Sequence, residues 1–538
     1  MEWWQKAIIY QIYPRSFNDT TGNGIGDLQG IISKLDYIQS LNCDAIWLCP
    51  IYPSPQKDFG YDVSDYQGIN PEYGTMDDFD QLIKMMHSRD MKLIMDFVPN
   101  HTSDQHPWFL EASKSKDNPY RDYYIWKDPK PGSSPPEPPN NWEGQFGGPA
   151  WSYHEATGQY YLHQFVREQP ELNYENPQVM VEMKENMRFW FDHDVDGLRL
   201  DTAPLYKKDQ SYQDDTIREN WDENAGKPAW KKWHFKPLID VNGVHDIIAE
   251  FRSVADEYPK KMLMGEIYLE FERLMTYYGE HGDLFQFPTN MTLVNEPFDL
   301  EVIKPLIIEY YQWFSKEPYT AAWPNWQFSN HDRLRMASRI PHNLRLAFLM
   351  LFTLKGTPIT YYGDEIGMLN GDIPSGQVKD PFATLSGDAG IIHNRDRCRT
   401  PMQWTDDDYA GFSTANPWLP ISPKYQEQNV KLMESDSTSL LNYFRELTKL
   451  RQTTPALYLG EIAFVPVPAD NINQLFIYSR TDDRSTYFIL LNFGNSPLEL
   501  DLQALLGLNN FELILSTIEM PTFTKEFHLP AHQGIILK

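Results

Sequence analysis

The sequence has little cysteine, a deficit of positive charge and no long apolar run. Its three cysteines, Cys43, Cys49 and Cys398, are an odd number and lack the spacing of metal ligands. They argue against a disulfide framework and favour a reducing compartment, so we expect a cytoplasmic protein. No window reaches the roughly 18 uninterrupted apolar residues of a membrane-spanning helix. The opening MEWWQKAIIYQIYPRSF lacks the basic cluster and cleavage site of a secretory signal, and we expect no membrane partner.

Acidic residues outnumber basic ones, with 75 Asp and Glu against 47 Lys and Arg, for a net charge of −28. Such a charge repels phosphate backbones and anionic membrane surfaces, so nucleic acid is not an expected partner. With 538 residues, 41% hydrophobic and 14% aromatic, the chain can bury a large core and form more than one domain. We find no internal repeat.

Short aliphatic or β-branched runs alternate with amphipathic stretches, which is typical of a mainly parallel α/β architecture. Eight such runs cover residues 7–13, 44–49, 92–98, 195–201, 261–267, 282–288, 325–331 and 357–363. Helical candidates, with apolar residues at a spacing of three and four, cover 28–41, 76–89, 178–193, 244–257 and 342–354. Eight strand-helix units predict an α/β fold, a (β/α)8 TIM barrel.

Two segments are too long to be ordinary loops of such a barrel. The first follows the third run, includes PKPGSSPPEPPNN and predicts an inserted subdomain over 102–174. The second runs from about Glu365 to Tyr425, after the eighth run. Beyond a helix near 437–451 the pattern changes to alternating strands such as TYFILLNF, which predicts an antiparallel β-sandwich domain over 456–538. The barrel then takes 1–101 and 175–455.

Charged residues stand at the ends of three predicted strands. In VDGLRLDTAP (195–204), Arg199 and Asp201 are two places apart and face the same side of an extended strand. Alone, this pair would be interpreted as a structural ion pair. Glu266 ends the fifth run, however, and Asp332 lies just past the seventh. Catalytic residues of such barrels come from the C-terminal ends of several strands, and stability explains a buried charge cluster poorly, so the three carboxylates predict an active site.

Motifs in order along nearly the whole chain resemble those of the α-amylase family of glycoside hydrolases (family 13). Within that family, the chain resembles the exo-acting α-glucosidase and oligo-1,6-glucosidase group. The motifs are IIYQIYPRSF, FGYDV, DFVPNH (96–101), QPELN (169–173), GLRLDTAP (197–204), GEIYL (265–269), FSNHD (328–332) and NRDRCRTPMQW (394–404).

The resemblance implies a retaining double displacement. Asp201 would be the nucleophile, kept ionised by Arg199, because a nearby cation lowers the pKa of an acid. Glu266 would be the general acid/base, since partial desolvation after the apolar run KMLM could hold its carboxyl protonated near neutral pH. Asp332 would bind ring hydroxyls and stabilise the oxocarbenium-like transition state.

The resemblance also implies a pocket for one terminal glucose. Its expected residues are Asp58, Tyr61, His101, Phe146, Phe165, Arg199, Thr202, His331 and Arg399. Among them, Asp58 and Arg399 match the pair that fixes the non-reducing end and makes the enzyme cut single residues. Tyr61 would stack on the glucose face, and the two histidines would donate hydrogen bonds to sugar hydroxyls. The two phenylalanines match aromatics that flank the scissile bond, with a role in the core as the alternative, and Arg395 is a further candidate.

The loop NDTTGNGIGD resembles the surface metal site of the family, which holds a Ca²⁺ or Mg²⁺ ion through oxygen ligands. The ligands would be Asp19, Thr21, Asn23, the carbonyl of Ile25, and Asp27. Thr21 stands where the group usually has Asn, and Asn23 where it usually has Asp, so one negative charge is missing and affinity should be lower. A glycine-rich acidic turn without metal is the alternative. We expect no organic cofactor.

The expected function is a retaining exo-α-glucosidase acting on maltose-like di- and oligosaccharides, with some transglucosylation. Thr202, directly after Asp201, favours α-1,4 linkages, because Val at this place tends to accompany α-1,6 preference. QPELN points the other way, toward an oligo-1,6-glucosidase. Glucosyl transfer and isomerisation of the trehalose synthase or sucrose isomerase type stay open. A non-catalytic ancillary subunit of a transporter would need an anchor and would lack the carboxylates. Monomer and homodimer both remain possible.

Overall fold

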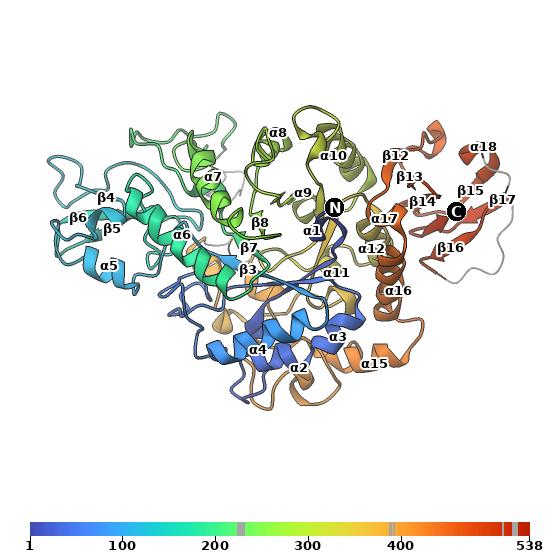
Figure 1. Ribbon diagram of the computed structural model, residues 1–538, viewed down its shortest axis with the longest axis horizontal. Helices are drawn as coiled ribbons and strands as arrows, with labels where there is room; N and C mark the ends of the chain where they lie inside the picture. Colours follow the sequence, from blue (N-terminus) through green and yellow to red (C-terminus); the bar gives the residue numbers. More distant parts are fainter. Residues whose placement is uncertain (223–231, 387–389, 391–392, 508–509, 519–525) are drawn as a thin grey trace.

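The structure is a computed structural model that describes residues 1–222, 232–386, 390, 393–507, 510–518 and 526–538. Figure 1 shows a central barrel with a small sheet subdomain at one end and a C-terminal β domain at the other. The TIM barrel with additional sheets that the sequence predicts is confirmed.

Eight parallel strands form the barrel wall, in the order β10-β11-β1-β2-β3-β7-β8-β9. They are β1 (Ile9–Ile12), β2 (Ala45–Leu48), β3 (Lys92–Phe97), β7 (Gly197–Leu200), β8 (Met262–Gly265), β9 (Phe287–Pro288), β10 (Asn325–Gln327) and β11 (Thr357–Tyr361). Each lies inside the corresponding expected run. Side chains such as Ile9, Ala45, Ile94, Met262 and Phe287 fill one buried cluster on these strands, so the barrel is packed at this level.

Helices alternate with the strands around the barrel. They include α2 (Leu28–Ser33), α3 (Leu35–Ser40), α4 (Met76–His87), α6 (Pro177–Asp192), α7 (Val244–Ala255), α8 (Phe271–Thr276), α10 (Leu300–Trp313) and α12 (Leu344–Thr353). The helix expected over 28–41 is two helices, because Lys34 leaves the helical conformation with φ −108° and ψ 7°. None of the helices in the described part of the chain combines the length and the apolar character that crossing a membrane requires.

Further helices lie in the loops, in the second insertion, and between that insertion and the C-terminal domain. They are α1 (Trp3–Lys6), α9 (Thr292–Asn295), α11 (Met336–Arg339), α13 (Pro381–Leu385), α15 (Val430–Ser435), α16 (Leu440–Thr453) and α17 (Pro455–Tyr458). The predicted helix near 437–451 corresponds to α16.

The inserted segment between β3 and α6 has its own sheet and core. After α5 (Pro107–Ala112), the strands β4 (Trp126–Lys127), β5 (Trp151–His154) and β6 (Gln159–Leu162) pair antiparallel in the order β4-β6-β5. Trp142, Trp151 and Leu162 share a buried cluster with Trp233 and Phe235 from the loop after β7. The insertion is therefore packed against a second barrel loop.

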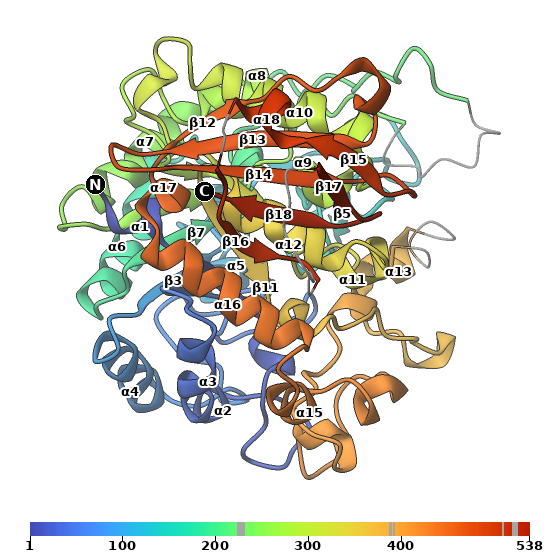
Figure 2. The ribbon, with the colours of Figure 1, turned by 90° about the vertical axis from the view of Figure 1, so that its right-hand side faces the viewer.

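The C-terminal domain has two sheets, which face the viewer in Figure 2. The larger has β12 (Glu461–Phe464), β13 (Leu475–Thr481), β14 (Thr486–Asn492), β18 (Gly534–Leu537) and β16 (Leu513–Ser516), and the smaller has β15 (Leu498–Asp501) and β17 (Glu526–Leu529), with α18 (Leu502–Leu506) beside it. Buried Arg480 of β13 donates to the carbonyls of Thr353 and Leu457, which fastens this domain to α12 and α17.

The barrel wall is completed between β9 and β10 by one side chain. The amide of Asn325 donates to the carbonyl of Pro288 at 2.6 Å and accepts from the N–H of Asn290 at 2.8 Å. The side chain thus replaces the backbone pairing that neighbouring strands make elsewhere in the wall. Asn325 is fully buried, so no water is at hand to satisfy these groups.

Substitution Asn325→Ala should leave both backbone groups unpaired, and it should lower the free energy of unfolding by about 2–4 kcal/mol. Urea unfolding followed by circular dichroism measures this change. Asn295→Ala, at an exposed position, is the matched control and should change the free energy by less than about 0.5 kcal/mol. An unchanged midpoint for Asn325→Ala would show that the seam does not depend on this side chain.

Candidate active site

Arg199 lies at the centre of the site. It pairs in register with Asp96 of β3, so the two side chains stand next to each other at the same end of the barrel. Its guanidinium makes ion pairs with Asp96 at 2.5 Å, Asp201 at 2.6 Å and Glu266 at 2.8 Å. The side chain is almost completely buried. One cation therefore gathers three carboxylates, where the sequence had predicted a single pair.

Local backbone geometry places the carboxylates. Asp201 directly follows β7, and Glu266 directly follows β8. Gly265, just before Glu266, is required by packing, because an added Cβ would lie 2.4 Å from the ring of Phe285. Thr202 turns the chain with a left-handed φ of 47°, and its N–H donates to Glu266 at 2.9 Å. A β-branched residue in this conformation is strained, which is a feature of functional sites.

Asp332, past the end of β10, faces the same space with other partners. Arg399 contacts its carboxylate at 2.7 Å, and His331 and Arg395 lie at 3.3 Å and 3.4 Å. Burial alone would raise the pKa of Asp332, but His331 and the two guanidinium groups outweigh it and hold the pKa well below its usual range. The side chain is 20% exposed, against 7% for Asp201 and 5% for Glu266. Asp332 is thus an ionised group open to a ligand.

The electrostatics of Asp201 differ from the sequence-based expectation. Burial, followed by the neighbouring carboxylate of Glu266, raises the pKa of Asp201 well above its ordinary value, and Arg199 lowers it by less. The expected effect of Arg199 is present, but this cation is shared among three acids. Asp201 therefore holds its proton to higher pH than a lone aspartate does.

A chain of hydrogen bonds fixes the aromatic wall of the site. The amide of Gln11 donates to Nδ1 of His331 at 2.8 Å, so Nε2 carries the hydrogen and faces Tyr61 Oη at 2.6 Å. Tyr61 in turn donates to Asp96 at 3.1 Å, and its ring stacks on His331. Burial lowers the pKa of His331 to about 3, so its ring is neutral and its one N–H is the group that faces Tyr61.

The second wall comes from the loops after β2 and β11. Asp58 makes its ion pair with Arg395, at 2.7 Å. Arg399, which the sequence pairs with Asp58 in fixing the non-reducing end, contacts Asp332 and donates to the carbonyl of His331 at 2.8 Å. Arg395 opens the short helix η8 (Arg395–Cys398) and is also held by buried Asp380 at 2.8 Å. No motif pointed to Asp380, because its partner lies fifteen residues further along the chain.

The inserted subdomain adds aromatic side chains beside His101. The rings of Phe165 and His101 lie 5.2 Å apart, and Phe146 lies 5.2 Å from Phe165. Arg395 stands 4.7 Å from the Phe146 ring. Burial lowers the pKa of His101 to about 3, so this imidazole is neutral as well. All nine substrate-binding candidates from the sequence thus lie in or next to one cluster of contacts at one end of the barrel.

A buried polar network under this wall was not expected from the sequence. Lys208, from the loop after β7, forms an ion pair with Glu171 of the QPELN motif and donates to Asn100 at 2.9 Å. Asn100 also donates to Glu171 at 2.9 Å. Gln169 of the same motif contacts His101 at 3.0 Å. The QPELN motif was the sequence signal for this network, because its Gln169 and its Glu171 each contact a residue just past the end of β3.

The predicted metal loop is closed by its own hydrogen bonds. Asp19 accepts from the N–H groups of Thr21, Gly22 and Gly24 and from the hydroxyls of Thr21 and Ser413. Asp27 accepts from Thr20 and caps α2, and Asn23 accepts from the N–H of Ile25. The side-chain oxygens of Asp19, Asn23 and Asp27 thus accept hydrogen bonds from the loop itself and, at Asp19, from Ser413. The cation remains a prediction.

Two buried carboxyls on one guanidinium, with a third ionised carboxylate facing them, can supply an acid, a nucleophile and a charge stabiliser. At the C-terminal end of a TIM barrel, this set defines the class of glycoside-bond-processing enzymes. The family model described as alpha amylase, catalytic domain, matches residues 11–460. The chain therefore belongs to the α-amylase family and is a glycoside hydrolase, as the motifs predicted.

Known proteins resemble the chain over most of its length. The oligo-1,6-glucosidase of Parageobacillus thermoglucosidasius is 37% identical, covering 91% of this chain and 90% of the relative. The α-glucosidase of Apis mellifera is 38% identical, covering 93% of this chain and 87% of the relative. Among solved structures, a mutant of the trehalulose synthase MutB in complex with Tris superposes with a TM-score of 0.89 at 31% identity, covering 100% of both chains.

A reaction that needs ionised Asp201 should lose rate as the pH falls through the raised pKa of this group. The acid limb of kcat/KM should therefore have its midpoint above the ordinary aspartate value of about 3.9. Initial rates with an α-glucoside from about pH 3 to about pH 9 give this midpoint. A midpoint at or below the ordinary value would contradict the raised pKa. Circular dichroism across the same range separates titration from acid unfolding.

Proposed function

We propose that the protein is a retaining exo-α-glucosidase that removes terminal glucose from α-linked di- and oligosaccharides, with α-1,4 linkages preferred. The observation that carries the proposal is the placement of Asp201 and Glu266 on the two nitrogens of one guanidinium, with Asp332 facing the same space. Relatives named oligo-1,6-glucosidase and α-glucosidase support the substrate class.

In the first step, a carboxylate oxygen of Asp201 attacks the anomeric carbon while Glu266 gives its proton to the leaving glycosidic oxygen. The C–O bond to the leaving sugar breaks, and a glucosyl ester of Asp201 forms. In the second step, Glu266 takes a proton from water, and the water oxygen replaces Asp201 at the same carbon. Two inversions leave the α-configuration unchanged. This route needs Asp201 ionised and Glu266 protonated at the start of the first step.

Asp332 supports the transition state from the other side. Its carboxylate stays negative because the guanidinium groups of Arg399 and Arg395 lie beside it, and it can bind ring hydroxyls as positive charge develops on the sugar. The neutral ring of His331 holds Tyr61 in place next to it. The ion pair of Asp58 with Arg395 closes the wall behind this position, which favours a terminal glucose over a chain interior. This closure supports exo action.

Substitutions Asp201→Asn and Glu266→Gln should each lower kcat by several orders of magnitude, because each removes one partner of the double displacement. Proton NMR of maltose hydrolysis by the unchanged enzyme should show α-glucose first, and maltotriose should be cut faster than soluble starch. Matching circular dichroism spectra control for folding. Near-normal turnover in either variant would reject the residue roles. Early β-glucose would reject retention, and rapid internal cleavage of starch would reject exo action.

Glucosyl transfer and isomerisation are the competing activities. The likeness to a trehalulose synthase structure supports them as the second candidate function. In these reactions a sugar hydroxyl, instead of water, resolves the glucosyl ester. Chromatography of products from maltose, isomaltose, sucrose and trehalose distinguishes them. The three cysteines are free and buried, which supports a reducing compartment and our proposal of a cytoplasmic location.

Linkage preference is assigned to Thr202. Its hydroxyl is buried and has no hydrogen-bond partner among the described residues, although its backbone N–H binds Glu266. Thr202 directly follows the proposed nucleophile, and its hydroxyl has no hydrogen bond to lose on turning toward the leaving sugar. A hydrogen bond formed with one linkage alone would contribute about 1 kcal/mol or more.

We therefore expect kcat/KM to be higher for maltose than for isomaltose, and Thr202→Val to move the ratio toward isomaltose by roughly tenfold. Valine keeps the shape of threonine and removes the hydroxyl, so it is the matched substitution, and Thr202→Ser, which keeps the hydroxyl, is the control. Steady-state kinetics with both disaccharides measure the ratio. Preference for isomaltose in the unchanged enzyme, which the oligo-1,6-glucosidase relatives favour, would overturn this assignment and leave the glucosidase proposal standing.

A further inference from the structure

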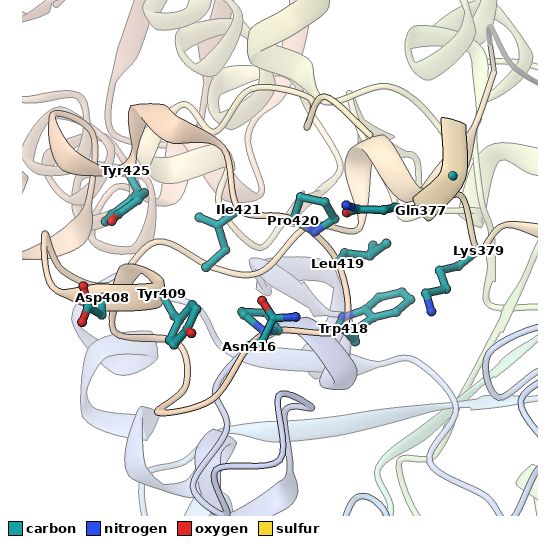
Figure 3. Close-up of a pocket in the computed structure, with 12 residues that line it drawn as sticks. Gln377, Lys379, Asp408, Tyr409, Asn416, Trp418, Leu419, Pro420, Ile421 and Tyr425 are labelled. Atoms are coloured by element: carbon teal, nitrogen blue, oxygen red, sulfur yellow. The ribbon is translucent and has the colours of Figure 1, made fainter. Parts of the chain in front are cut away.

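The second insertion forms a groove outside the active site, with a volume of about 680 Å³. Figure 3 shows Tyr409, Asn416 and Trp418 along one side of it and Gln377 and Lys379 at one end. None of the proposed catalytic or substrate-binding residues lines it. The volume lies within the range of ligand pockets in proteins, roughly 300–1,000 Å³.

The groove has an aromatic platform that is held in place from behind. The ring of Trp418 stacks on Tyr13 at 6.3 Å, packs on Phe59 at 5.1 Å and carries the Arg15 guanidinium 5.0 Å from its centre. Its indole N–H donates to Ser16 at 2.9 Å. With these contacts already made, the ring loses little freedom when a ligand arrives, which favours binding.

Tyr409 presents a second ring from a strained loop. Tyr409 and Ala410 both have left-handed φ values, of 52° and 58°, and Gly411 follows at 64°. The side chain of Tyr409 is 37% exposed. Two consecutive non-glycine residues in this region are unusual, and such strain clusters at ligand clamps. The loop thus holds a large apolar ring at the rim of the groove.

Four polar side chains around these rings are exposed and lack a partner in the part of the chain that the structure describes. Within the described residues, Gln377, Lys379, Asp408 and Asn416 make no side-chain hydrogen bond or ion pair with another residue. The amides can both donate and accept. The one basic and the one acidic group cancel in charge, which disfavours a strongly charged ligand.

Rings that offer apolar faces, together with unpaired amides and no net charge, match the two surfaces of a neutral sugar. A pyranose has an apolar C–H face, which packs on an aromatic ring, and a rim of hydroxyls, which bind amides. We propose that this groove is a second carbohydrate-binding site, which takes a neutral gluco-oligosaccharide of at least disaccharide size. The site belongs to the same sugar chemistry as the active site but does not depend on the linkage that the enzyme cuts.

Isothermal titration of the Asp201→Asn variant with maltotriose tests the site without hydrolysis. We expect a binding event that is weakened at least about tenfold by adding Tyr409→Ala. Tyr153→Ala, which removes a tyrosine of similar exposure, 38%, from β5, should leave that event unchanged. Asn416→Ala gives a second variant should Tyr409→Ala fail to fold, which circular dichroism will show. Repeating the titration with isomaltose covers the other linkage.

The result that would overturn the proposal is the absence of any binding event that depends on Tyr409 or Asn416, whether the parent variant shows one site, two or none. This outcome is separate from failure of the proposed function. Loss or change of hydrolytic activity is measured on the unchanged enzyme, whereas binding at the groove is measured on a variant without the proposed nucleophile.

Discussion

The charge of Arg199 is the interaction on which the rest of the site depends. At the end of the barrel, Asp96, Asp201 and Glu266 all contact this one guanidinium. Removing several carboxylates from water is costly unless a cation and hydrogen bonds compensate them. The parallel register of β3 and β7 supplies the compensation, because it sets Asp96 beside Arg199. The barrel thus fixes the geometry before any sugar binds.

Arg199 is shared among three acids, and this sharing explains why the pKa values of Asp201 and Asp332 shift in opposite directions. Asp332 has the guanidinium groups of Arg395 and Arg399 and the ring of His331 around it, so its pKa falls. Asp201 has only a share of Arg199 and is next to Glu266, so its pKa rises. The two environments thus push the pKa values of Asp201 and Asp332 in opposite directions, and Asp332 stays ionised beside the two proposed catalytic carboxyls.

The sequence predicted the barrel and the three carboxylates because both depend on local pattern. Each strand is a short run, and Asp201, Glu266 and Asp332 directly follow such runs. Contacts between residues far apart in the sequence could not be predicted in this way. The sequence named Asp58 and Arg395 separately, but it gave no sign that they form an ion pair, because they lie far apart along the chain. Helix α10 escaped detection because Pro305 interrupts its pattern, and Asp380 has no motif at all.

The barrel interior has an apolar layer that stabilises the fold and, at one end, a charged layer that forms the site. One layer is apolar, with Ile9, Ala45, Ile94 and Met262 in a single buried cluster. The next layer holds the buried charges, the left-handed Thr202 and its unpaired hydroxyl. Each of these features opposes folding, and in a natural protein such departures gather where function requires them. Packing can offset their cost in two places. Strand β8, which leads to Glu266, contributes Met262 and Met264 to this apolar layer, whereas β7 and β10 place Leu198, Leu200 and Trp326 in the larger core around the barrel. Burial of these side chains therefore lets the site hold its unsatisfied groups ready for a substrate.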